Sequence, residues 1–556
     1  MKISQKLVFL LAIMLLGVTL LSACSSNNGG KKNGDRPSSS PSETTDNKET
    51  KEDAVPREGL PLSKELQEVN IVTVVLDGKP ASSEILYWKD IEAETNVRVK
   101  FQDVAQSQWN EKKGLLFASD ELPDAFIGHA ILSEIDLLNY GAQGQLIPLE
   151  KLIEEYAPNL NKVFVEYPEL KQQLTAPDGH IYSIPTFDDG VVPEVGYPLF
   201  VNKQWLEDVG LEVPVTTDEF EQMLLAFKEQ KKTVEGSAVI PLTTGPGNNF
   251  FSQLFGAFGV IDYYPTGSNQ FGAHIYNKDN EVFYTAATEE YKNAIKYFHR
   301  LYSQGLIDNE SFTQDGSVMG SKIKTVPRIV GAFQGWRSTA WANTEEEVGD
   351  YIAIGPLKGP DGHQMWMKNL TGLTTHGSFA ITKKAEKPEL LMRWVDNLLS
   401  DDNSLRMAFS YRFGDTIEKT TDNKIKILRN LDWNNPSESL TAPSSSSGFS
   451  FMTRSNANRF LDIPSHMVEK KGYDKLYEGY TVNRFPKFFV SQEESQKLAT
   501  VGTDLNTYAN SMYAKWIVKG GIDEEWDGYL KQLNAMGMDE YVGIYQTAFD
   551  RYNNVK

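Results

Sequence analysis

Short apolar runs alternate with amphipathic stretches in the first part of the chain. The runs 71–76, 97–101 and 122–128 have the length and apolar character of buried strands, and the segment 83–95 has a helical pattern. Strands separated by helices of this length are typical of a parallel α/β sheet. The pattern therefore predicts that the folded body begins with such a sheet.

Polar and aromatic residues follow these predicted strands. Asp77 comes directly after the first strand, Trp109 ends the stretch that follows the second, and His129 follows the third. Ligands of parallel α/β sheets gather outside the carboxyl ends of the strands. We therefore take these three residues as candidate ligand-binding residues.

The later part of the chain is mostly helical by its periodicity. Apolar residues recur on one helix face over 291–302, again after Pro388, which suits a first helical turn, and again over 522–533. The segments 216–219 and 491–494 have the pattern of capping boxes that open helices. Four tryptophans on such helical stripes are interpreted as core residues: Trp205, Trp394, Trp516 and Trp526.

The N-terminus has the features of a secretory signal peptide. Lys2 and Lys6 supply positive charge, the run 7–21 is apolar, and the run ends in Leu-Ser-Ala-Cys at Cys24. This ending resembles a bacterial lipobox, in which the cysteine receives diacylglycerol and becomes the first residue of the mature chain. Cys24 is the only cysteine, so it has no disulfide partner within the chain. We expect a lipoprotein, palmitate included, anchored on the extracellular face of the cell membrane; the alternative is an unmodified cysteine in an ordinary signal peptide.

A polar segment separates Cys24 from the predicted sheet. From residue 25 to about 61 the chain is rich in Ser, Asn, Gly, Pro, Thr, Glu and Lys, with hardly an apolar residue. Such a segment cannot bury enough surface to offset the entropy lost on ordering. We expect residues 24–64 to form a lipidated, flexible tether.

Composition and charge narrow the functional classes. The 556 residues are 40% hydrophobic and 11% aromatic, enough to build a core. The formal net charge of −20 argues against nucleic acid as a partner, because phosphates require a basic face. Beyond the first two dozen residues no apolar run approaches the length of a membrane span.

Catalytic signatures are scarce. The chain has no His-Glu-x-x-His pair, no cysteine cluster, no phosphate-binding loop and no Gly-x-Ser-x-Gly elbow. The acid pairs Asp188–Asp189 and Asp401–Asp402 have the residue types that glycoside hydrolysis uses. Adjacency in sequence says nothing about facing geometry, so surface or helix-capping roles are the simpler interpretation.

From about residue 69 to 556 the chain resembles the family 1 extracellular solute-binding proteins, the lipoprotein components of carbohydrate ABC importers, and among them the LplA-like group of Gram-positive bacteria. The resemblance rests on the order and coverage of several segments. These are PDGHIYSIP at 177–185, LFVNKQWLEDVGL at 199–211 with Pro214, Thr216 and Glu219 after it, AITKK at 380–384 with 388–394, and the C-terminal stretches 520–526 and 537–550.

The resemblance implies an α/β, two-lobe periplasmic-binding-protein-like fold of type II with a helical C-terminal region. The order of elements places residues 65–187 and 376–440 in lobe 1, and 188–375 and 441–556 in lobe 2. The two lobes would close on a ligand held between them.

A sugar-binding cleft needs aromatic platforms and convergent polar groups. Trp336, Trp366 and Trp433 lie in loop contexts and are candidates to line the cleft, and Arg337 beside Trp336 could bond hydroxyls or a carboxylate. Two acids at the crossover between the expected lobes are candidates for the same reason. Asp188 and Asp189 could accept hydrogen bonds from sugar hydroxyls, with a hinge-surface role or, for Arg337, a structural ion pair as the alternatives.

One departure from the family concerns calcium. Many relatives carry an acidic, EF-hand-like loop after the helix that contains Ala-Phe-Lys, but the segment 226–241 has lysines where oxygen ligands belong. Only Glu235 and Ser237 offer side-chain oxygens there, and calcium takes six to eight. We expect no metal site and no cofactor. The alternating polar residues at 277–281 lack the glycine turn and are read as a hairpin loop.

These observations together predict a non-enzymatic, monomeric binding protein. Its partners would be an oligosaccharide ligand, the ABC permease subunits and the membrane. A glycan-sensing or adhesion lipoprotein with the same fold is an alternative, and a secreted polysaccharide-cleaving enzyme is another.

Overall fold

The computed structural model describes the folded body of the protein; the predicted signal peptide, Cys24 and most of the predicted tether lie outside the described residues. The residues from Ala54 to Lys556 form one compact unit. Within it the structure describes residues 55–75, 79–189, 195–230, 238–245, 253–263, 272–335, 338, 347, 349–368, 372–431, 438, 441–445, 447–462 and 465–554.

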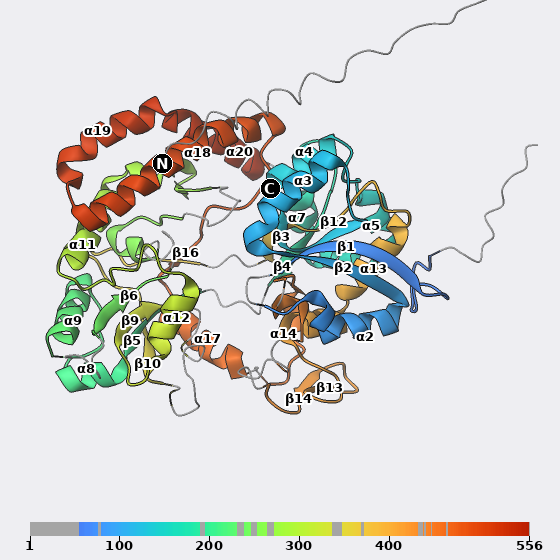
Figure 1. Cartoon of the computed structure of the whole chain (residues 1–556), viewed down its shortest axis with the longest axis horizontal. Coiled ribbons are helices and arrows are strands. Elements are labelled where there is room, and N and C mark those ends of the chain that lie inside the picture. Colours follow the sequence, from blue (N-terminus) through green and yellow to red (C-terminus); the bar gives the residue numbers. More distant parts are fainter. Residues whose placement is uncertain are drawn as a thin grey trace, which may run out of the picture. The chain divides into compact units, whose positions relative to one another are not determined.

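The first large element of the fold is a six-stranded sheet with the order β15–β4–β12–β3–β1–β2 (Figure 1). Its strands are β1 (Gln67–Val75), β2 (Val97–Ala105), β3 (Ala125–Leu132), β4 (Ile184–Asp188), β12 (Gly372–Ile381) and β15 (Phe451–Met452). Strand β1 is parallel to β2 and β3, and β15 is parallel to β4, whereas β12 runs antiparallel between β3 and β4. The three strands predicted from the apolar runs are confirmed as β1, β2 and β3.

Alternate residues of this sheet face two different cores, as the pleat of a strand requires. Ile71 and Ile127 belong to one core, and Val72 and Phe126 to the other. The first core also takes side chains from α2 (Leu86–Thr95), α5 (Glu150–Tyr156), α6 (Pro158–Glu166), α7 (Pro168–Leu174) and α13 (Pro388–Leu398). The second takes them from α3 (Trp109–Ser119) and α4 (Glu134–Ala142). Helices therefore cover both faces, and only the strand ends are left for a ligand.

A separate four-stranded sheet has the order β10–β5–β9–β6. Its strands are β5 (Leu199–Asn202), β6 (Ile240–Thr243), β9 (Val330–Gln334) and β10 (Tyr351–Ile354). The helices that share its core are α8 (Lys203–Val209), α9 (Thr217–Gln230), α11 (Glu289–Ser303) and α12 (Gly316–Lys324), with the hairpin β7 (Ile275–Lys278) and β8 (Glu281–Tyr284). The hairpin confirms the interpretation of 277–281.

The C-terminal region is helical, as expected, and its helices share the core of the four-stranded sheet. It contains α17 (Ser465–Leu476), β16 (Thr481–Val482), α18 (Gln492–Lys519), α19 (Ile522–Ala535) and α20 (Met538–Asn554), and β16 pairs with β11 (Trp366–Met367). Both predicted capping boxes are present. Ser491 and Glu494 cap α18, and the Thr216 hydroxyl accepts a hydrogen bond from the Glu219 amide at the start of α9.

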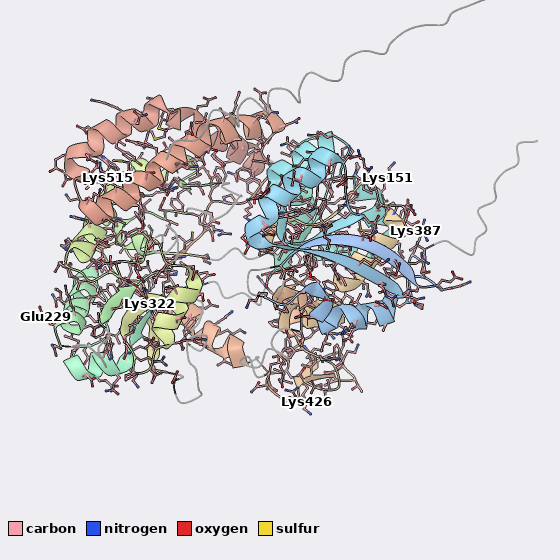
Figure 2. All side chains as sticks on the ribbon, viewed as in Figure 1. Lys151, Glu229, Lys322, Lys387, Lys426 and Lys515 are labelled. Atoms are coloured by element: carbon pink, nitrogen blue, oxygen red, sulfur yellow. The ribbon has the colours of Figure 1, made fainter. Side chains whose placement is uncertain are left out.

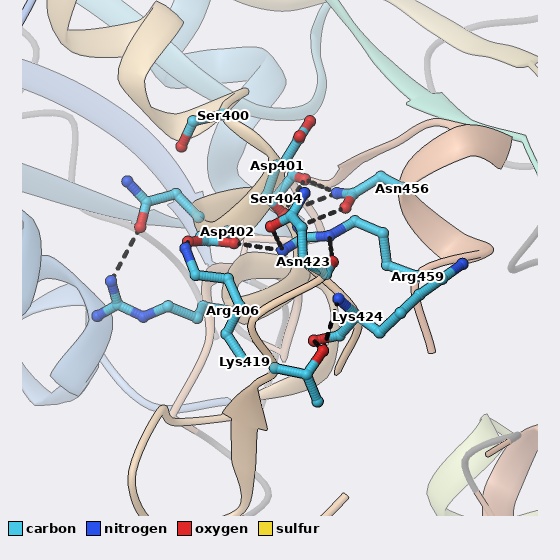
Figure 3. Close-up of polar contacts among 12 residues, drawn as sticks. Ser400, Asp401, Asp402, Ser404, Arg406, Lys419, Asn423, Lys424, Asn456 and Arg459 are labelled. Carbon is cyan, nitrogen blue, oxygen red and sulfur yellow. Dashed lines mark hydrogen bonds and ion pairs between the residues drawn. The ribbon is translucent and has the colours of Figure 1, made fainter. Parts of the chain in front are cut away.

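A small hairpin is tied to a neighbouring helix by a polar network (Figure 3). Arg459 pairs with Asp402 at 2.7 Å, and Lys419 pairs with the other oxygen of Asp402 at 2.6 Å. Arg459 also donates to Asn456 Oδ1 at 3.0 Å. These contacts join α14 (Asp401–Phe409), α16 (Arg454–Ala457) and β13 (Ile417–Lys419), and β13 pairs with β14 (Ile425–Ile427).

The sheets divide the chain somewhat differently from the predicted lobes. Strand β12 begins at Gly372, before the expected return at 376, and β15 pairs with β4 although its residues lie within the predicted 441–556 segment. A two-residue strand has no periodicity from which its sheet could be predicted. The division into two lobes itself stays a prediction.

Candidate functional site

A cavity of about 510 Å³ lies at the edge of the six-stranded sheet where β4 and β15 end and β12 begins. Asp188, the last residue of β4, is opposite Gly372, the first of β12, and Met452, the last of β15. Asp189, Gly372 and Arg454 contribute to the cavity wall. Its volume is typical of small-molecule sites, and it lies at the carboxyl edge where α/β sheets bind ligands.

The cavity combines aromatic rings with polar groups. Its aromatic residues come from the α6–α7 junction, from β4 and from the last helix, α20: they are Tyr167, Phe187, Phe549 and Tyr552. Tyr167 packs edge-on against Phe187 with ring centroids 4.8 Å apart, and Tyr552 stacks on Phe488 at 5.1 Å. Amide and carboxylate groups from Gln173, Glu169 and Asn483 lie among these rings. The lining therefore suits a ligand with apolar faces and hydrogen-bonding edges.

Asp189 is held by a well-defined set of contacts. Tyr167 donates its hydroxyl to Asp189 Oδ2 at 2.9 Å, and Arg454 Nη2 lies 2.8 Å from Oδ1. The Asp189 amide donates to the carbonyl of Met452 at 2.8 Å, which ties it to β15. Burial and the neighbouring carboxylate raise the pKa of Tyr167, so this phenol stays protonated as a donor. Of the candidate residues predicted from sequence, Asp189 is one that the structure places in the cavity wall.

Two further cations line the cavity from the segment before α18. Lys487 Nζ donates to the carbonyl of Thr374 at 2.7 Å, and the Arg484 guanidinium lies 4.9 Å from the ring centre of Tyr263. Burial lowers the pKa of both groups. Each cation is held in place by a neutral group.

His129 lies close to this cation pair. Its amide donates to the carbonyl of Ser447 at 3.0 Å, and Gly448 passes so near that a Cβ there would lie 2.9 Å from His129 Cβ. The surrounding protein, and then the charge of Lys487, lower the pKa of His129 to about 4, although part of its surface is exposed. The imidazole is therefore neutral at physiological pH.

Beside Lys487 a second histidine is paired with an acid. His376 Nδ1 lies 2.9 Å from Glu134 Oε1, and its Nε2 lies 3.1 Å from the carbonyl oxygen of Gln173. Burial opposes ionisation of Glu134, but His376 and Lys487 outweigh it and lower its pKa to about 2. Glu134 is therefore ionised and already engaged by His376.

Two predicted tryptophans are packed in the interior. Trp109 is 6% exposed, and its Nε1 donates to the carbonyl of Ile131 at 2.7 Å. Trp366 is 1% exposed, packs against Tyr477 with centroids 4.9 Å apart, and donates to the carbonyl of Gly196 at 3.4 Å. The structure brings neither indole to the cavity, because each ring is surrounded by core side chains.

The remaining candidates divide into two groups. Asp188 is 8% exposed and precedes the cavity residue Asp189 at the end of β4. Five predicted residues lie outside the described residues, and their roles stay predictions: Asp77, Trp336, Arg337, Trp433 and the lipidation site Cys24.

Sequence reasoning missed the cationic part of the cavity. Arg454, Arg484 and Lys487 are far from the predicted strand ends in the sequence, and their segments carry no periodicity. The one signal was the basic pattern Asn-Arg-Phe-Pro-Lys at 483–487 in an acidic chain. The aromatic wall from α20 was hidden because its residues also fit an ordinary amphipathic helix.

The acid pairs considered for hydrolysis have structural partners. Asp402 is engaged by Arg459 and Lys419 (Figure 3), and Asp189 by Arg454. Across the described residues no group of three or more His, Cys, Asp or Glu side chains could hold a metal ion. The segment 231–237, within the altered calcium loop, lies outside the described residues, so the loss of that site stays a prediction.

Comparison with known proteins identifies the family. Residues 79–404, more than half of the chain, match the profile of the bacterial extracellular solute-binding proteins. The chain belongs to this family. Membership makes it a solute-binding protein rather than an enzyme, as the sequence predicted.

Individual relatives of this solute-binding protein agree over nearly the whole body. The fructooligosaccharide ABC transporter substrate-binding protein FusA of Streptococcus pneumoniae is 32% identical over 510 residues, which cover 88% of this chain and 91% of FusA. The structure of a FusA EF-hand mutant in complex with fructo-nystose aligns with a TM-score of 0.77 at 29% identity, covering 88% of this chain and 100% of that one. An HMO-binding ABC-transporter-associated solute-binding protein from Bifidobacterium longum infantis aligns with a TM-score of 0.73 at 24% identity, covering 87% and 99%. These likenesses confirm the predicted α/β solute-binding fold of type II.

None of the helices in the described body of this solute-binding protein combines the length and apolar character needed to cross a bilayer.

Proposed function

We propose that this solute-binding protein is a lipid-anchored extracellular subunit that captures an oligosaccharide and delivers it to an ABC permease. The observation that carries the proposal is the cavity at the carboxyl edge of the six-stranded sheet, where aromatic rings alternate with hydrogen-bonding groups. Sugar rings present apolar faces and hydroxyl edges, so such a lining is complementary to them. The described function of FusA as a fructooligosaccharide-binding transporter component supports the same class of ligand.

The proposed anchor is the lipidated Cys24, followed by the polar tether to about residue 64. Two or more acyl chains give stable membrane attachment at about 0.8 kcal/mol per buried methylene. In cells, Cys24→Ala should move the protein from the membrane fraction into the medium and abolish labelling with palmitate. Retention of the variant in the membrane with unchanged labelling would contradict the anchor.

The proposed mode of binding is closure of two lobes on the sugar. In this proposal Trp336, Arg337 and Trp433 with Asp77 and His129 complete the ligand surface around Asp189. Trp336→Ala should weaken binding by about tenfold or more without lowering the melting temperature, since aromatic anchors dominate binding energy. Unchanged affinity would count against this placement of Trp336.

The deciding experiment measures the melting temperature of the purified protein against neutral and uronate-containing oligosaccharides, with product analysis on each hit. A ligand that binds only the folded state must raise stability, so saturable stabilisation by an intact sugar supports the proposal. Cleavage of the sugar would contradict it. Deletion of the gene should then abolish uptake of the same sugar; normal uptake would point to a sensor or adhesin.

A further inference from the structure

The cavity has a charge balance opposite to that of the protein. The chain as a whole has a formal net charge of −20. Within the described part of the chain, the charged residues of the cavity wall are instead four cations and two acids: Lys368, Arg454, Arg484 and Lys487 against Glu169 and Asp189. This excess of positive charge is local, so it calls for a local explanation.

Two of these cations lack acidic partners. Arg454 is paired with Asp189, but Arg484 and Lys487 form no ion pair with any carboxylate among the residues that the structure describes. The nearby Glu134 is bonded to His376. Two lysines elsewhere on the body, Lys426 and Lys515 (Figure 2), differ. Lys426 lies 2.9 Å from Glu418, and Lys515 lies 2.6 Å from Glu525.

The placement of Arg484 and Lys487 costs free energy in the protein alone. Removing a cation from water costs free energy unless an opposite charge compensates it. Here burial lowers the pKa of Lys487, the charge of Glu134 raises it in part, and the neighbouring Arg484 lowers it again. The groups in direct contact with the two side chains are a carbonyl and an aromatic ring, and the carboxylate of Glu134 is already bonded to His376. An anionic ligand would supply the missing charge.

We propose that the cavity selects an oligosaccharide that carries a carboxylate, such as a uronic acid unit, and that Arg484 and Lys487 contact this carboxylate. The inference rests on the proposed function, because it assigns a chemical class to the sugar bound in the same cavity. The arginine fork matches the two oxygens of a carboxylate, and the lysine adds a point charge. Asp189 and the aromatic rings would serve the hydroxyls and the ring faces.

The test compares matched charged and neutral sugars by isothermal titration calorimetry on the full chain purified in detergent. The charged probes are trigalacturonate, trimannuronate and a glucuronic acid-bearing xylotriose; the neutral probes are the methyl ester of each and kestose. We expect at least one charged probe to bind about tenfold or more tighter than its own methyl ester. A sulfated trisaccharide separates carboxylate recognition from binding of any anion.

Variants of Lys487 and Arg484 test whether these two residues contact the carboxylate of the charged probe. Lys487→Gln and Arg484→Gln should each weaken the charged probe by about tenfold and the methyl ester by less than about twofold. Lys426→Gln and Arg429→Gln, which change the same residue types at the exposed hairpin, should leave both affinities unchanged. Equal weakening of charged and neutral probes by Lys487→Gln would overturn the assigned contact.

A measurement on the unaltered protein covers the case in which a variant does not fold. Raising NaCl from about 50 mM to about 500 mM should weaken the charged probe and leave its methyl ester unchanged. Binding of kestose or the esters with no preference for any carboxylate overturns this inference and leaves the proposed function standing. Preference for the sulfated sugar overturns the carboxylate assignment, and failure of every sugar to bind removes both proposals.

Discussion

The hairpin network around Arg459 and the cavity around Lys487 use similar side chains in opposite ways. Arg459 is 7% exposed, and its guanidinium is matched by Asp402 and by amide oxygens (Figure 3). Lys487 donates a hydrogen bond to the carbonyl of Thr374, a neutral group. In the first region the charges complete each other within the fold. In the second region, Arg484 and Lys487 form no ion pair with a carboxylate among the described residues. We use this difference to separate a structural charge from a functional one.

The largest effect should follow from breaking the matched network. Arg459→Ala removes one of the two cations that engage Asp402 and the Arg459 donor to Asn456 Oδ1, so the free energy of unfolding should fall by about 3 kcal/mol. Urea denaturation followed by tryptophan fluorescence measures this. Arg429→Ala is the matched control, because the Arg429 pairs are exposed and should contribute less than about 1 kcal/mol. Equal losses of unfolding free energy in Arg459→Ala and Arg429→Ala would show that the buried network stabilises the fold no more than the exposed pairs do.

Removing the unmatched cation should have a smaller effect on stability. Lys487→Met removes the desolvation cost of a charge whose attraction by Glu134 is partial, and it takes one donor from the Thr374 carbonyl, so the free energy of unfolding should stay within about 1 kcal/mol of the wild type. The same denaturation measurement applies. A loss as large as that expected for Arg459→Ala would mean that Lys487 is a structural charge.

A pH effect should distinguish the surroundings of the cavity from those of the hairpin. The pKa of His129 is lowered to about 4, so the folded state favours the neutral imidazole. Its contribution to stability is present above the usual histidine pKa near 6.5 and is lost as the pH falls from about 6.5 to about 4. His129→Gln should therefore lose less stability than the wild type between about pH 7 and about pH 5. Parallel curves would show that His129 is not desolvated.

The smallest effect is expected from calcium. The segment 226–241 lacks the oxygen ligands of an EF-hand-like loop, so adding a chelator or excess calcium should leave the melting temperature unchanged. A calcium-dependent rise after chelation would contradict the prediction. The FusA protein, whose EF-hand has been altered in a solved structure, is a suitable comparison.

Local sequence patterns predicted individual strands and helix starts. They could not predict which segments far apart in the sequence pair with each other. Apolar runs indicated β1 to β3, and the Ser491–Glu494 box indicated the start of α18, because these signals lie within a few residues. Trp366 had the sequence context of a loop, yet it is buried because β11 pairs with β16 more than a hundred residues later.

The candidate cavity was predictable in part from the family resemblance. Asp189 was proposed because it lies at the crossover that the resemblance implies, and the structure places it directly after β4 in the cavity wall. Lys487 and Tyr552 were missed, since they reach the cavity from segments whose sequence gives no sign of that destination. Charge matching could not be read from sequence either: lysines are common, and only the structure shows which of them lack an acid.

The position of α20 has a practical consequence for handling the protein. Phe549, Tyr552 and Asn553, near the end of the last helix, form part of the cavity wall. An affinity tag or fluorescent protein fused directly after this helix would begin beside the candidate cavity and compete for space with any ligand bound there. Attachment through the polar segment that precedes the folded body avoids this interference, so immobilised-ligand screens and biosensors built on this protein should be tethered from that side.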